Sequence, residues 1–181
     1  MIRAFLALVL VLSGCAATSR PESTGTPTGT KGFNAIDVMF LQMMVPHHEQ
    51  GLRVVRLARV RPVRPEVKML AEAIEATQFD EAAAMAGWLR SWGAPPSADP
   101  NSHAAHGGPR GLTEAELASV VNADDAGFER GFLDLLISHQ DDARQLASME
   151  MSGGINPEAR KLADSIDKSR EAQIKQMLSY R

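Results

Sequence analysis

The chain has 181 residues, a formal net charge of −3, 44% hydrophobic residues and only 5% aromatic residues. This length is enough for one domain with a hydrophobic core, and the nearly balanced charge gives no indication of nucleic-acid binding. The sequence has no Cys nucleophile, Gly-rich phosphate-binding loop or Ser-centred motif, so we expect no enzyme activity.

The N-terminus reads as an export signal. In "MIRAFLALVLVLSGC", Arg3 precedes an apolar run that is too short to span a bilayer as a helix. The run ends in a sequence that resembles the lipobox of bacterial lipoproteins, which implies a signal peptide over residues 1–14 and lipidation of Cys15. The alternative is an ordinary secretory signal that contains a cysteine. We expect the mature protein to be anchored to the outer face of the cytoplasmic membrane, in the periplasm or at the cell surface.

Residues 15–33 are rich in Thr, Ser, Pro and Gly, which predicts a flexible tether. Four helical patterns follow, at about 34–60, 65–92, 124–151 and 157–180, and no strand-like alternation is present. A linker at about 94–123 includes a short helix at "LTEAEL", with Thr113 as its N-cap and Glu116 completing a capping box. The predicted fold class is all-α, in one bundle over residues 34–181.

The two helical pairs are one unit written twice. At a constant offset of 92 residues, Phe40 matches Phe132, His47 matches His139, and Pro65 matches Pro157. One hairpin cannot bury its apolar stripe alone, so the repeats, at about 34–93 and 124–181, should pack into a single four-helix bundle.

Several polar residues fall on faces that the helical period predicts to be buried. His47 lies at the centre of the first apolar stripe, with Asp37, Met44 and His48 on its flank, and Pro46 is expected to kink this helix. Glu81 lies in the stripe of the second helix, which also contains Leu70, Ile74, Thr77, Met85 and Trp88. A buried carboxylate needs a cation, a histidine or a proton as its partner.

The second repeat keeps His139 but has Gln140 and Gln173 where the first has His48 and Glu81. A metal inside the bundle would therefore take most of its ligands from the first repeat. The alternatives are core histidines without a metal, or an acid–base pair formed by Glu81 and a histidine. His103 and His106 in the linker could form an auxiliary site. A basic run that includes Arg61 and Arg64 predicts a solvated face that complements the acidic stretch around Asp125 and Glu129.

The pattern D-x-x-F-x-x-x-M-x-x-H-H at 37–48, followed by A-x-x-I-x-x-x-Q-x-x-E-x-x-x-M-x-x-W-L at 71–89, resembles the DUF305 family. The resemblance implies a ferritin-like four-helix bundle in an exported bacterial protein, often duplicated, with some members linked to copper. Carried over to this sequence, it implies metal-ligand candidates at Asp37, Met44, His47, His48, Glu81 and His139. The sequence departs from the family pattern where valine (Val54 or Val55) replaces a methionine and where Gln140 breaks the second histidine pair.

The sequence thus predicts a lipid-anchored, non-catalytic protein that binds a transition metal, copper before zinc or iron, and buffers or sequesters it. The expected partners are the metal ion and, through Cys15, the membrane, while homo-oligomerisation is left open. The alternative is a structural or interaction lipoprotein with a vestigial metal site and core histidines.

Overall fold

The computed structural model describes residues 32–97 and 111–181. The predicted signal peptide, Cys15, most of the tether, His103 and His106 lie outside these residues. The helices are α1 (Ala35–Val55), α2 (Leu57–Val60), α3 (Pro65–Ser91), α4 (Glu114–Val121), α5 (Asp125–Gly153) and α6 (Pro157–Ser179). The described residues form no strand, and the predicted all-α, ferritin-like bundle is confirmed.

The helix ends follow the signals in the sequence. Asn34 caps α1, Asn156 caps α6, and Pro65 and Pro157 begin α3 and α6. Thr113 and Glu116 form the predicted capping box of α4.

The first predicted helix is divided in two. Arg56 keeps helical backbone angles, but the helical hydrogen-bond pattern is interrupted there, so α2 is separate from α1. Pro46 lies inside α1 with its side chain exposed, and the kink predicted at this residue stays a prediction. A proline on the solvent side leaves the freed carbonyl accessible to water, which makes it tolerable inside a helix.

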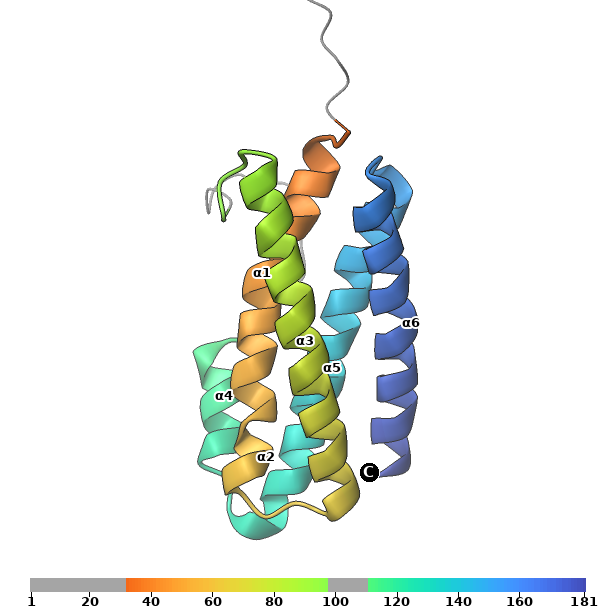
Figure 1. Cartoon of the computed structure of the whole chain (residues 1–181). Helices are drawn as coiled ribbons and strands as arrows, with labels where there is room; N and C mark the ends of the chain where they lie inside the picture. The colour runs from red at the N-terminus through yellow and green to blue at the C-terminus, as the bar shows by residue number, and fades with distance from the viewer. Residues whose placement is uncertain (1–31, 98–110) are drawn as a thin grey trace, which may run out of the picture.

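Two helical hairpins make up the bundle. The first pairs α1 with α3 and the second pairs α5 with α6, while α1 also packs directly against α5. The four long helices run side by side, and α4 lies on the outside of the bundle (Figure 1), where it packs against α5.

The core consists of two apolar clusters. One contains Val54 and Ile74 from the first repeat with Phe128 and Phe132 from the second. The other contains Phe40, Met44, Met85, Ala147 and Ile166. No helix among the described residues combines the length and apolar content needed to cross a membrane.

Ion pairs at the surface connect the two repeats. Arg61 contacts Asp125 at 3.1 Å, and Arg64 contacts Glu129 at 2.6 Å. These pairs confirm that part of the basic run complements the acidic stretch. Because the side chains are partly exposed, each pair contributes little to stability.

Candidate metal centre

A layer of polar side chains lies in the middle of the bundle. Its members come from the central turns of α1, α3, α5 and α6, and each has at most 5% of its surface exposed. They are His47, His48, Gln78, His139, Gln140 and Arg170. We call these six residues, together with their contacts Glu81 and Gln173, the polar layer. Buried polar groups require hydrogen-bond partners or a bound ion, so the partners of each must be accounted for.

His47 and His139, the equivalent histidines of the two repeats, stack on one another. Their ring centroids are 3.8 Å apart and the ring planes differ by 9°. Neither nitrogen of either ring has a hydrogen-bond partner. The His48 ring lies beside them, with its centroid 6.1 Å from that of His47. Three imidazoles are therefore gathered in the core, mostly without the partners that buried rings normally have.

The environment keeps the stacked rings neutral. Burial lowers the pKa of His47 well below its ordinary value, and the neighbouring His139 and His48 add to the effect. Burial, with His48 and Arg170 nearby, lowers the pKa of His139 to about 3. A neutral imidazole has one nitrogen lone pair that can bind a metal without first losing a proton.

His48 differs from the other two because one of its nitrogens is occupied. Its Nε2 lies 2.8 Å from Glu81 Oε2, and the same carboxylate forms an ion pair with the guanidinium of Arg170. When Nε2–H donates to this carboxylate, Nδ1 carries the lone pair, and Nδ1 has no other partner. Carboxylates orient metal-binding histidines in the same way. Glu81 therefore has the histidine and the cation that a buried carboxylate needs as partners, and it orients His48.

The second repeat forms the equivalent contact with amides. Gln140 donates through Nε2 to Gln173 Oε1, at positions 92 residues after His48 and Glu81. Gln78 in turn donates to Gln140 Oε1 at 3.2 Å. The layer thus has approximate two-fold symmetry in its positions but not in its chemistry, because only the first repeat supplies a histidine–carboxylate pair.

Gly51 provides the space in which the layer fits. A Cβ atom at this position would lie 2.6 Å from His139 Nε2 and would also overlap Gln78 Oε1. Real Cβ atoms do not approach other atoms so closely, so the absence of a side chain at position 51 allows α1 to face His139 and Gln78.

The structure separates Asp37 from the histidines. Asp37 precedes His47 by ten residues, which is about 15 Å along a helix axis. Its carboxylate accepts hydrogen bonds from the backbone N–H groups of Asn34, Ile155 and Asn156. This carboxylate already has a structural role at one end of the bundle.

Met44 lies closer to the polar layer. It precedes His48 by one helical turn on the same face of α1, and it is fully buried in the apolar cluster with Met85. Its thioether is therefore at the border of the polar layer, consistent with both a core role and a ligand role.

The buried face of α3 is rotated relative to the prediction. Thr77 is exposed, Gln78 is fully buried, and the side chain of Glu81 retains 11% exposure at the edge of the core. The sequence placed Gln78 at the edge of the apolar stripe and Arg170 at the equivalent position of the second repeat, but it predicted a role in the site for neither residue.

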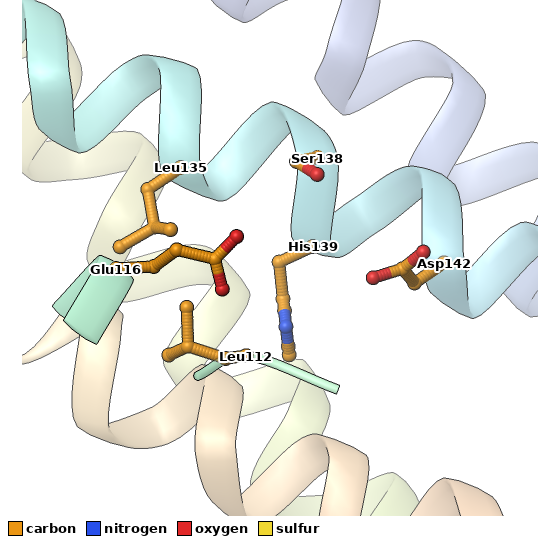
Figure 2. Close-up of a pocket in the computed structure, with 6 residues that line it drawn as sticks. All are labelled: Leu112, Glu116, Leu135, Ser138, His139 and Asp142. Atoms are coloured by element: carbon orange, nitrogen blue, oxygen red, sulfur yellow. The ribbon is translucent and has the colours of Figure 1, made fainter. Parts of the chain in front are cut away.

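A small cavity reaches His139 from the side of α4. It has a volume of about 30 Å³ and is lined by Leu112, Glu116, Leu135, Ser138, His139 and Asp142. The His139 side chain extends toward Leu112, between the carboxylates of Glu116 and Asp142 (Figure 2). This cavity is therefore an approach to the layer from outside, with acidic groups on both sides.

Within residues 32–97 and 111–181, no three His, Cys, Asp or Glu side chains converge closely enough to hold one ion. The rings of His47 and His139 are in contact, the His48 ring lies beside them, and the thioether of Met44 is at their border. This set fits a soft metal ion that accepts a low coordination number, as Cu(I) does, better than it fits a hard cation.

Comparisons with known proteins agree with this fold. The sequence matches DUF305, a domain of unknown function, over residues 37–181. The structure is similar to that of a DUF305 protein from Streptomyces coelicolor, with 28% identity, a TM-score of 0.73, and coverage of 78% of this chain and 88% of that one. A DUF305 fragment from Deinococcus radiodurans has 27% identity and a TM-score of 0.71, with 81% and 95% coverage.

A further similar structure is that of CopM in its Cu(I)-bound form, with 30% identity, a TM-score of 0.66, and coverage of 80% of this chain and 94% of CopM. CopM has also been solved in Cu(II)-bound and Ag-bound forms. No curated protein matches the chain. Since the family match extends over most of the sequence and the bundle has the same fold, the chain belongs to the DUF305 family.

Proposed function

We propose that this protein is an exported, lipid-anchored and non-catalytic copper-binding protein that buffers or sequesters the metal in the polar layer. The observation that carries the proposal is the set of buried imidazole nitrogens without partners: both of His47, both of His139, and Nδ1 of His48. Buried groups of this kind are rare in a packed core unless an ion or water satisfies them.

The donor chemistry favours copper over zinc or iron. Imidazole and thioether are ligands that suit copper, and Cu(I) in particular. In this proposal His47, His48 and His139 are the imidazole candidates from which an ion of low coordination number takes its ligands, Met44 is the thioether candidate, and Glu81 orients His48. Asp37 is left out of the ligand set because backbone N–H groups already occupy its carboxylate. Copper binding by CopM, which has the same fold, supports this assignment.

Export is supported by the N-terminal sequence. The lipobox-like end of the signal at Cys15 provides the anchor, and the S. coelicolor relative is described as a candidate secreted protein. A site in the bundle would then meet copper outside the cytoplasm.

The test is metal binding by the purified protein and by the double variant His47→Ala/His48→Ala. We expect the wild type to bind copper stoichiometrically and to melt at a higher temperature with it, because a ligand of the folded state stabilises that state. The double variant should lose both effects while keeping its helical circular dichroism. His103→Ala/His106→Ala is the matched control and should bind as the wild type does. Loss of binding in the control alone would move the site to the linker.

The second candidate is a structural or interaction lipoprotein whose histidines belong to the core. It is favoured by the closed pair of Glu81 and Arg170, which satisfies the buried carboxylate without a metal. On this reading, copper should leave the melting temperature unchanged, and His47→Ala should lower it through the loss of packing against His139.

A further inference from the structure

Arg170 is the one cation inside the polar layer among the described residues. It has no exposed surface, and its guanidinium contacts Glu81, which also contacts His48. The equivalent residue of the first repeat is the neutral Gln78. A position that holds an amide in one repeat therefore holds a permanent positive charge in the other.

This charge fixes the total charge of the layer. Glu81 contributes −1 and Arg170 contributes +1, while Gln78, Gln140 and Gln173 are neutral amides. The three histidines are neutral ligands when their lone pairs bind a metal. The protein groups around a bound ion therefore sum to zero.

A neutral buried site discriminates between ions by their charge. The free energy needed to transfer an ion from water to a medium of low dielectric constant rises with the square of the ionic charge. Unpaired, the carboxylate of Glu81 would offset part of this penalty for a dication; Arg170 cancels that contribution.

Resting on the copper-binding function proposed above, we propose that Arg170 determines the charge selectivity of the site. By neutralising Glu81 it makes the layer selective for a soft monovalent cation, Cu(I) or Ag(I), over divalent cations such as Zn(II). Arg170 contacts the carboxylate of Glu81, which orients His48. Its guanidinium has no lone pair to offer a metal, so its role is in selectivity and not in ligation.

The test measures the affinities of the purified protein for Ag(I) and Zn(II), two ions that need no redox control, and compares their ratio across a charge series. The wild type and Glu81→Gln/Arg170→Gln have a layer charge of 0. Arg170→Gln has −1 and Glu81→Gln has +1. Glutamine is suitable because the first repeat already carries it at position 78.

We expect Arg170→Gln to shift the affinity ratio toward Zn(II) by on the order of tenfold or more, because one uncompensated charge acts on a nearby ion in a medium of low dielectric constant. Glu81→Gln should shift the ratio the other way, and the double variant should restore the wild-type ratio. A ratio that is the same in all four proteins would overturn the proposal, as would a double variant that keeps the ratio of a single variant.

Removing one member of a buried ion pair can prevent folding. If circular dichroism shows that Arg170→Gln is unfolded, the comparison of Glu81→Gln with the double variant decides the question, because their layers still differ by one charge.

A wild type that binds neither Ag(I) nor Cu(I) contradicts the proposed function itself. If the protein binds these ions but the ratio of its Ag(I) and Zn(II) affinities does not change with the charge of the polar layer, only the role of Arg170 is contradicted.

Discussion

At the scale of single residues, Gly51 has an effect beyond its size. Alanine is favoured over glycine in a helix interior by about 1 kcal/mol, yet its Cβ would overlap Gln78 and His139. We expect Gly51→Ala to keep the protein folded and to weaken copper binding at least tenfold, because His139 must move away from His47. Titration followed by a melting curve measures both effects.

Gly87 is the matched control, since a Cβ there would have its nearest neighbour at 3.8 Å. Gly87→Ala should leave copper affinity as it is. Equal affinities in the two alanine variants would show that the space at Gly51 has no part in metal binding.

Glu150 makes the stability of the protein depend on pH. Burial, with Asp37 facing it, raises the pKa of Glu150 to about 8, an effect that the nearby Arg160 opposes. In the folded protein this carboxyl stays protonated while the unfolded chain ionises above its ordinary pKa. The contribution of Glu150 to stability is therefore present below about pH 4.5 and is lost as pH rises toward 8.

Glu150→Gln replaces this group by a neutral side chain of the same shape. We expect the variant to gain stability relative to the wild type as pH rises from 5 to 8, by at most about 1.4 kcal/mol per pH unit. Denaturant unfolding at several pH values measures the difference. A difference that does not change with pH would mean that Glu150 is ionised in the folded protein.

At the scale of helices, Asp37 connects the start of α1 to the turn between α5 and α6. Its carboxylate accepts from Ile155 N at 3.0 Å and from Asn156 N at 2.8 Å, some 118 residues away along the chain. Hydrogen bonds to charged acceptors contribute about 1.5–3 kcal/mol each, so one side chain holds the two hairpins together at this end.

Asp37→Ala should therefore lower the free energy of unfolding by about 2–4 kcal/mol and leave copper stoichiometry unchanged. Chemical unfolding and metal analysis of the same preparation give both values. Asp164→Ala, which removes an exposed carboxylate paired with Lys168, should change stability by less than about 0.5 kcal/mol. Lost copper at unchanged stability would instead make Asp37 a ligand.

At the scale of the whole molecule, the two repeats place equivalent positions opposite each other but fill them with different chemistry. His48 and Glu81 in one repeat correspond to Gln140 and Gln173 in the other, with the same contact in both. The backbone of the second repeat is therefore already arranged for a histidine–carboxylate pair.

The double variant Gln140→His/Gln173→Glu restores this pair. We expect it to bind Ag(I) at least tenfold more tightly than the wild type, or to bind a second ion, because it adds a fourth imidazole and a negative charge to the layer. Isothermal titration gives affinity and stoichiometry together. Gln173→Glu alone separates the effect of charge from that of the added ligand, and binding that stays at the wild-type level would show that the second repeat cannot contribute.

The sequence by itself determined where the helices lie, that they form two repeats, and that the histidines of the first helix face the core. Helical period, caps and prolines act locally, and the constant offset of 92 residues forces two equivalent hairpins to share one core. The same period indicated that His47 and His48 face inward and that Glu81 needs a partner.

Only the tertiary structure decided which side chains meet. The stacking of His47 on His139, the pairing of Glu81 with Arg170 and the separation of Asp37 from the histidines depend on how α1, α3, α5 and α6 are rotated and aligned. A rotation of one helix by a fraction of a turn exchanges Thr77 for Gln78 in the core. That rotation is set by packing across all four helices at once, which the period of a single helix does not contain.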